Sequence, residues 1–131
     1  RPEVLRWQKE TVQKARETEY CRTLIGRYRK LPNINSTRAK LRTHSERAAI
    51  NTPIQGGAAD IVMQAMIRIH ENHSLRMWGW RQLLQVHDEL ILEGPEESAE
   101  EAMSIVQDLM ANPFPQPLLV PLETDGAIGD N

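Results

Sequence analysis

The stretch LQVHDELIL, residues 84–92, places three ionisable side chains between two short apolar runs that lack helical spacing. Runs of this kind that lie so close together predict a β-hairpin, and its tight turn carries His87, Asp88 and Glu89. Because the flanking runs are strongly apolar, we expect both strands to be buried in a sheet with the acids at its rim.

Two adjacent carboxylates at the tip of a hairpin repel each other, and a cation bound beside them offsets this repulsion. Mg²⁺ suits such a place because it takes few protein carboxylates and leaves positions for water and phosphate oxygens. Asp88 and Glu89 are therefore candidate metal ligands. The alternative is that they are only solvated turn residues.

A second constellation consists of Arg47, Asn51 and Gln55, whose spacing of four residues places them on one face of a helix. Planar hydrogen-bonding side chains in such a row can meet the acceptors that every correct base pair presents in the minor groove. The row therefore predicts a contact with duplex nucleic acid that is independent of sequence. The alternative is a polar stripe that faces solvent.

Charge is distributed unevenly along the chain. Residues 1–47 contain 13 Lys and Arg against 5 Asp and Glu, a balance of +8, whereas residues 48–131 contain 3 against 13, a balance of −10. The basic part is suited to phosphates and the acidic part to metal ions, although solvated faces alone can produce the same division. No run approaches the roughly 20 apolar residues of a membrane helix, which excludes a membrane span.

The single cysteine, Cys21, cannot form an internal disulfide or a thiolate metal site, which fits a reducing compartment. We interpret it as a small, half-buried residue. The first residues lack an initiating Met and the features of a signal peptide, so the beginning of the chain is expected to be a cut end.

Hydrophobic periodicity and turn residues predict the remaining elements. They are an amphipathic helix from Pro2 to about Glu19, a β-hairpin from Tyr20 to Leu31 around Gly26 and Arg27, a polar loop from Asn33 to Arg42, a long helix from Ser45 to His73 that is kinked or divided near Pro53 and Gly56, a helix from Gly94 to Asn112, and a last strand from Leu118 to Glu123.

Three stretches resemble, in order, a family A DNA polymerase, the class of bacterial DNA polymerase I. They are TLIGRYRKLP at residues 23–32, RAAINTPIQGGAAD at 47–60 and QVHDEL at 85–90. The resemblance covers nearly the whole chain. It implies an α+β fold in which a palm-type antiparallel β-sheet, with the catalytic acids on a hairpin, packs against long helices as part of a right-hand polymerase. Residues 1–42 would form the base of the fingers and residues 43–131 part of the palm.

The resemblance also assigns roles to single residues. The turn matches motif C, in which Asp88 is one of two aspartates that hold the catalytic metals, Glu89 is an auxiliary acid near them and His87 lies beside the primer end. The residues expected to contact DNA are Arg47, Asn51, Gln55, Arg27 and Arg29.

By this resemblance the chain is part of a template-directed DNA polymerase that adds deoxynucleotides to a primer 3′ end with two Mg²⁺ ions. Its expected partners are primer–template DNA, deoxynucleoside triphosphates and the remainder of the parent polymerase, with no membrane. The expected location is intracellular, in the bacterial cytoplasm or in a mitochondrion or plastid.

The chain departs from the family pattern in several places. The second catalytic aspartate, the helix that binds the incoming nucleotide, and the family's C-terminal Trp and basic residues are absent, so this segment alone is expected to be inactive. Gly57 stands where the family usually has Ser or Thr.

Two other functions remain open. In a noncatalytic DNA-binding module, Asp88 would have no role. In a metal-dependent phosphohydrolase, the His87–Asp88 pair would need further ligands from His44, His70 or His73. The simpler interpretation of the last two histidines is a solvated helix end.

Overall fold

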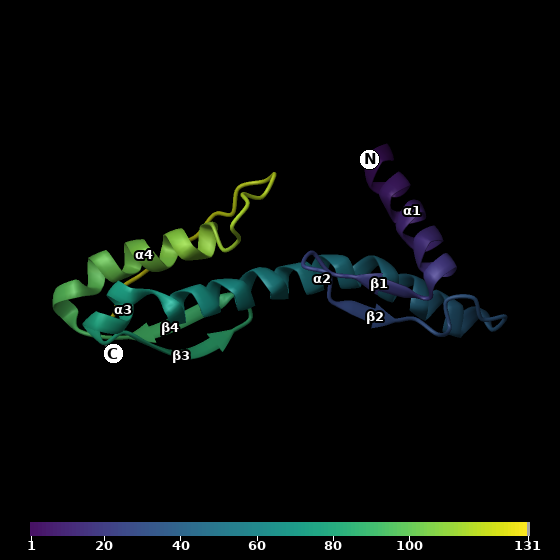
Figure 1. Ribbon diagram of the computed structural model, residues 1–131. Coiled ribbons are helices and arrows are strands. Elements are labelled where there is room, and N and C mark those ends of the chain that lie inside the picture. The colour runs from purple at the N-terminus through teal and green to yellow at the C-terminus, as the bar shows by residue number, and fades with distance from the viewer. Residues whose placement is uncertain (131) are drawn as a thin grey trace. The chain divides into compact units, whose positions relative to one another are not determined.

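The computed structural model describes residues 1–130, and it divides the chain into two compact units, Arg1–Asp60 and the part from Ile61 onward. Helices and two small antiparallel sheets make up the chain, so the predicted α+β class is confirmed (Figure 1). In order, the elements are α1 (Pro2–Thr18), β1 (Tyr20–Arg22), β2 (Tyr28–Lys30), α2 (Ala39–Glu71), α3 (His73–Trp78), β3 (Arg81–Val86), β4 (Glu89–Glu93), the single 3₁₀ turn η1 (Glu96–Ser98) and α4 (Ala99–Ala111).

The first unit contains the predicted amphipathic helix and the predicted hairpin. α1 ends where Glu19 adopts the left-handed conformation, with φ of 61°. The chain then enters the β1–β2 hairpin, in which Tyr20 lies opposite Lys30. The turn is closed by Gly26, whose φ of 91° favours glycine and whose N–H donates to the Thr23 carbonyl. A small core holds these parts together, and its buried members are Ala15, Cys21, Leu31, Ile34 and Ala49.

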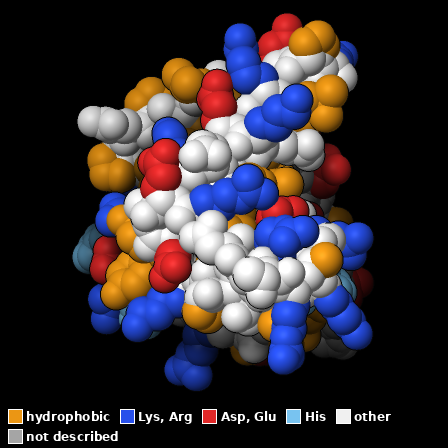
Figure 2. Space-filling model, turned by 90° about the vertical axis from the view of Figure 1, so that its right-hand side faces the viewer, with side chains coloured by type: hydrophobic (Ala, Val, Ile, Leu, Met, Phe, Trp, Pro, Cys, Tyr) orange, Lys and Arg blue, Asp and Glu red, His pale blue; other side chains and the backbone are white. Residues whose placement is uncertain are grey.

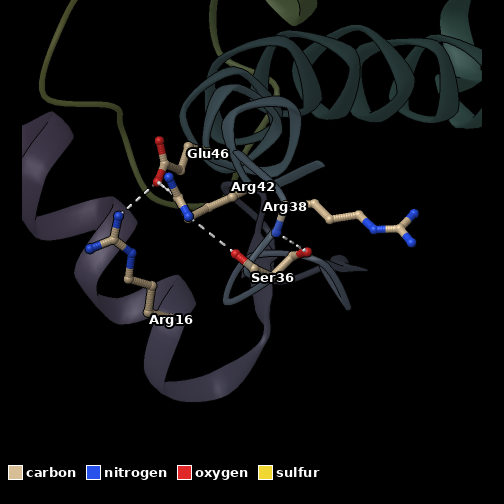
Figure 3. A network of polar contacts seen from close by, with 5 residues as sticks. All are labelled: Arg16, Ser36, Arg38, Arg42 and Glu46. Atoms are coloured by element: carbon tan, nitrogen blue, oxygen red, sulfur yellow. Dashed lines mark hydrogen bonds and ion pairs between the residues drawn. The ribbon is translucent and has the colours of Figure 1, made fainter. Parts of the chain in front are cut away.

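A polar network fixes the loop that follows the hairpin (Figure 3). Glu46 accepts a hydrogen bond from Arg16 at 2.7 Å and lies 3.8 Å from Nε of Arg42. Arg42 also donates to the Ser36 carbonyl at 3.3 Å, and the Ser36 hydroxyl accepts from the backbone N–H of Arg38 at 3.1 Å. Glu46 therefore joins α1, the loop and the first turns of α2.

The long helix α2 differs from its prediction at both ends. It begins at Ala39, six residues before the expected start, so the predicted polar loop ends at Arg38. It is one continuous helix of 33 residues to Glu71, although Pro53 lies within it and cannot donate a backbone hydrogen bond. Among residues 1–130, no helix is both long and apolar enough to cross a bilayer.

The second unit has a core of its own. Its buried members are Ile69, Leu75 and Ala102, with Trp80, Leu90, Leu92, Ile105, Val106, Leu109 and Met110 packed against them. The helix predicted from Gly94 to Asn112 is confirmed: it consists of η1 and α4, and Asn112 is its C-cap. Two hydrogen bonds position the surrounding elements, from Trp80 Nε1 to Ser98 Oγ at 2.8 Å and from Arg68 to the Asn112 carbonyl at 2.8 Å.

The predicted β3–β4 hairpin is present, but the expectation that both strands are buried is wrong. Leu83, Leu84 and Ile91 are 57%, 53% and 46% exposed, respectively. The reason is that the sheet has only two strands. One face of such a hairpin packs on the helices, and the residues that point the other way find no partner within the described chain.

Two further predictions need correction. The short helix α3 was not expected, because its six residues are too few for a periodic apolar pattern. It is defined by its ends, since the Asn72 side chain accepts from the N–H of Leu75 at 3.0 Å and Gly79 ends it with φ of 85°. The predicted last strand from Leu118 to Glu123 is wrong, because these residues form no ladder with another strand and a strand requires one.

The contact between the β1–β2 turn and α2 depends on glycine at one position and not at the next. A Cβ on Gly56 would overlap the Thr23 side chain, whereas a Cβ on Gly57 would lie 3.6 Å from Leu24 Cβ, an ordinary contact. We therefore expect Gly56→Ala to destabilise the first unit by about 1–3 kcal/mol through overpacking. Gly57→Ala should be neutral or stabilising by up to about 1 kcal/mol through helix propensity.

Chemical denaturation of the two variants and of the pair Gly56→Ala with Thr23→Ala measures this effect. The double variant should recover part of the loss, since it removes the clashing methyl group. Equal stability of the two single variants would contradict the proposed close contact.

Candidate active site and nucleic-acid interface

The acidic turn is tighter than predicted. Val86 lies opposite Glu89 in the β3–β4 ladder, so only His87 and Asp88 form the turn. Glu89 was expected in the turn but is the first residue of β4, because two residues suffice to reverse the chain. His87 has φ of 54°, a conformation that glycine usually supplies at the first position of such a turn.

One local hydrogen bond spans this unusual turn. The Gln85 side chain donates from Nε2 to the carbonyl of His87. His87, Asp88 and Glu89 are all exposed, and within the described chain neither acid forms an ion pair. The turn therefore offers two neighbouring carboxylates to solvent. Oxygen donors of this kind suit a hard divalent cation, but they supply only part of its ligands.

The histidines of the phosphohydrolase hypothesis lie at exposed positions of three different helical segments. His44 is exposed in α2, His70 is exposed in its last turn and His73 is exposed at the start of α3. No group of three or more His, Cys, Asp or Glu side chains capable of holding a metal is found among residues 1–130. The convergence that this hypothesis requires is therefore not observed.

Arg47, Asn51 and Gln55 lie on α2 as predicted, and all three are exposed. The helix positions about half a turn away from them include Ser45, Ala49 and Asp60, which are buried. The stripe is thus the outward face of a helix whose opposite face is packed within the first unit. This placement fits both a nucleic-acid contact and a solvated stripe.

The structure also brings the basic hairpin to this helix. A hollow of about 330 Å³ is lined by Arg27, Arg29 and Gln55 together with Thr23, Tyr28, Thr52 and Gly56. Arg29 reaches the Thr52 hydroxyl at 3.4 Å. Three of the five residues expected to contact DNA therefore share one surface of the first unit.

Arg27 has a structural partner that the motifs do not reveal. Its Nε and Nη2 lie 2.7 and 2.6 Å from Oδ1 of Asp60, whose side chain is fully buried. The other carboxylate oxygen accepts from the N–H of Ile25 at 3.3 Å. Half of the Arg27 side chain remains exposed, at 51%. The signal in the sequence is a lone carboxylate within a stretch of small and apolar residues.

The pKa of Asp60 is lowered from its ordinary value of 3.8. Burial raises the pKa, but the Thr23 hydroxyl, the Arg27 guanidinium and the Ile25 N–H together outweigh it. The Thr23 hydroxyl is buried beside this carboxylate. Asp60 is therefore an ionised carboxylate inside the first unit at neutral pH.

Comparison with known proteins identifies the class to which this fold and these motifs belong. The model of DNA polymerase family A matches residues 1–131. The chain belongs to this family.

Individual relatives agree with this assignment. The chain is 53% identical over 116 residues to the mitochondrial DNA polymerase I B of Oryza sativa subsp. japonica, which covers 87% of this chain and 11% of that protein. It is 42% identical over 128 residues to the thermostable DNA polymerase I of Thermus filiformis, covering 98% of this chain and 15% of the relative. The chain thus spans between about a tenth and a sixth of these relatives.

A solved structure is similar as well. It is described as the POL domain of Pol1 from M. smegmatis in complex with DNA primer–template and dNTP. The TM-score is 0.82 at 42% identity, and the match covers 89% of this chain and 20% of the other. The predicted fold, as a segment of a polymerase domain, is confirmed.

The Arg27–Asp60 pair leads to a prediction with a matched control. Arg27→Ala leaves a buried carboxylate without its cation, so we expect it to destabilise the protein by about 2 kcal/mol. Arg29→Ala removes an exposed side chain with one long contact, and its effect should stay within about 0.5 kcal/mol. Urea denaturation at neutral pH measures both variants, and similar losses would contradict the special role of Arg27.

The same pair has a pH dependence. Because the folded-state pKa of Asp60 is depressed, its contribution to stability is present above pH 3.8 and is lost as the pH falls through the lower folded value. Asp60→Asn should abolish this part of the acid-induced loss. An unchanged acid titration of stability in Asp60→Asn would show that other carboxylates cause it.

Proposed function

We propose that the protein containing this chain is a template-directed DNA polymerase that adds deoxynucleotides to a primer 3′ end. The observation that carries the proposal is the match to DNA polymerase family A along the entire chain. It is supported by the likeness to a POL domain described with primer–template and dNTP. The proposed partners are therefore primer–template DNA, deoxynucleoside triphosphates and the rest of the polymerase.

Membership in this family implies use of a divalent metal, and we propose that it is Mg²⁺, with two ions in the complete site. Asp88 would be the main ligand supplied by this chain, with Glu89 as an auxiliary acid. Their exposed, adjacent carboxylates at an open turn have the right donor chemistry. When bound, such ions activate the primer hydroxyl and stabilise the charge of the leaving pyrophosphate. The remaining ligands must come from outside the described part of this chain.

The protein residues have distinct tasks in this proposal. Asp88 and Glu89 present fixed negative charge at the turn, and His87 lies next to them, where the primer end would approach. Arg47, Asn51 and Gln55 donate hydrogen bonds to minor-groove acceptors of the duplex. Arg27 and Arg29 add positive charge near Gln55, although Arg27 already uses two nitrogens on Asp60.

The proposal extends to organisation and location. Residues 1–42 would belong to the base of the fingers and residues 43–131 to the palm. The protein would act inside the cell, in a bacterial cytoplasm or in a mitochondrion or plastid. Identity is 53–54% to plant polymerases named mitochondrial or chloroplastic and 39–42% to the Thermus enzymes, so relatives of both kinds support the proposal and the three locations are not distinguished.

The first test of this function is removal of the Asp88 carboxylate from the complete polymerase. Asp88→Ala should lower turnover by several orders of magnitude while primer–template affinity stays nearly constant, because the carboxylate acts mainly in the transition state. Glu89→Ala should have a milder effect. Single-turnover extension and equilibrium DNA binding measure the two quantities. Near-normal turnover of Asp88→Ala would favour a noncatalytic role for this chain.

The second test concerns the stripe on α2. In the complete polymerase, Arg47→Ala and Gln55→Ala should cost about 1–3 kcal/mol in extension from matched primer ends and much less from mismatched ends. The reason is that a mismatch displaces the minor-groove acceptors, so the hydrogen bonds are already lost.

Extension by one nucleotide from paired and mispaired termini compares the variants with the unmodified enzyme. Equal losses on both primers would mean that these residues only anchor the duplex. No loss on either primer would identify the stripe as solvated.

A further inference from the structure

A second hollow, of about 480 Å³, lies on the first turns of α2. It is lined by Lys40, His44 and Arg47 together with Ala39 and Thr43. All five side chains are exposed. Two of them are permanently cationic near neutral pH, and the imidazole and hydroxyl groups add hydrogen-bonding capacity. The polar groups of the lining suit an anion, and they stand among Ala39, the Thr43 methyl group and the apolar stems of the long side chains.

The hollow is continuous with the minor-groove stripe. Lys40, His44, Arg47, Asn51 and Gln55 follow one another at intervals of three and four residues, so all five fall on one face of α2. From Lys40 to Arg47 the helix rises about 10 Å, roughly three base-pair steps of a duplex. The polar face therefore extends beyond Arg47 by two turns that carry cationic side chains.

The positive charge in this hollow is not used within the protein. Glu46 is paired with Arg16 and Arg42 on another side of α2, and Asp60 is paired with Arg27. In residues 1–130, Lys40 and Arg47 form no ion pair. Arg38 contacts the network through its backbone only, and its side chain points away (Figure 3). Lys and Arg side chains are spread over the face of the first unit that Figure 2 shows.

We infer that Lys40 and His44, which line the part of the hollow beyond Arg47, form a phosphate site that takes the backbone of the primer–template duplex, a few base pairs away from the bases that Arg47, Asn51 and Gln55 touch. This inference rests on the proposed function. An α-helix that reads the minor groove at one point must leave it further along, because the groove curves around the duplex while the helix is straight. The phosphodiester backbone borders the groove, so the cationic turns meet phosphates there.

A phosphate group could also come from the incoming nucleotide. The backbone source is favoured because Lys40 lies on the same helix face as the stripe and about 10 Å along the axis from Arg47, roughly three base-pair steps. The two sources differ in a measurable way. A backbone phosphate affects DNA affinity and its salt dependence, whereas a nucleotide phosphate affects the KM of the nucleotide.

The test uses the complete polymerase and a short primer–template duplex. Affinity is measured by fluorescence anisotropy over a salt series of about 50 to 200 mM. Lys40→Ala should reduce the slope of log Kd against log salt by about 0.9, the value for one phosphate contact. Across that series the variant should then lose about 3–4-fold less affinity than the unmodified enzyme. At low salt, Lys40→Ala should weaken DNA binding equally for matched and mismatched primer ends, because a phosphate contact does not depend on the base pair.

Two variants serve as controls. Lys40→Arg keeps the charge and should keep the slope. Lys9→Ala removes an exposed lysine of α1 in the same unit that lies outside the hollow, and it should leave the slope unchanged. An unchanged slope in Lys40→Ala, or an equal change in Lys9→Ala, would overturn the inference.

The remaining outcomes separate the alternatives. A raised nucleotide KM in Lys40→Ala with normal DNA binding would overturn the backbone assignment. If Asp88→Ala abolishes turnover and retains DNA binding, a negative result with Lys40 counts against the phosphate site alone. If the unmodified protein does not bind primer–template DNA, the proposed function fails as well.

Discussion

The pairing of Arg27 with the buried carboxylate of Asp60 is the interaction on which the first unit depends. A carboxylate without solvent contact is costly unless a cation and hydrogen bonds compensate it, so Asp60 requires the β1–β2 turn at one place on α2. Gly56, one helical turn earlier, permits the close approach of Thr23. The hairpin is thereby held against one side of α2, Gln55 borders it, and Arg47 and Asn51 stay exposed.

This division explains the unusual composition of α2. A helix of a small domain normally carries an apolar stripe, whereas the part of α2 that belongs to the first unit buries Ala49 and Gly57 together with Ser45 and Asp60. Small residues bury little apolar area, so polar pairing takes over part of the stabilisation. The core of the second unit is more conventional, with Ile69 and Leu75 packed against α4. The N-terminal part of α2 is thus held by polar pairs, and its C-terminal part packs into an apolar core.

Features that depend on neighbouring residues could be predicted from the sequence, and features that depend on distant partners could not. Both hairpins and the helices α1 and α4 follow from periodicity and from turn residues such as Gly26 and Pro113. Burial of β3 and a last strand at Leu118 failed because both require a partner strand, which local sequence does not specify. Asp88 and Arg47 are predicted as site residues both by local patterns and by the resemblance, and their roles stay predictions. Asp60 ends the second motif, but neither its ion pair nor the position of Lys40 was predicted, since the importance of each depends on which charges surround it.

The acidic turn combines two local costs that have a common explanation. His87 occupies a backbone region that disfavours side chains, at about 1–2 kcal/mol, and two unit charges 4 Å apart in water repel by about 1 kcal/mol. A domain with a stability of roughly 5–15 kcal/mol can carry both. A glycine at 87 and an amide at 88 would remove them without altering the strands. The strained turn, whose His87 carbonyl accepts from the Gln85 side chain, therefore does not stabilise the hairpin itself, and the divalent cation of the proposed function would offset the repulsion between the two carboxylates.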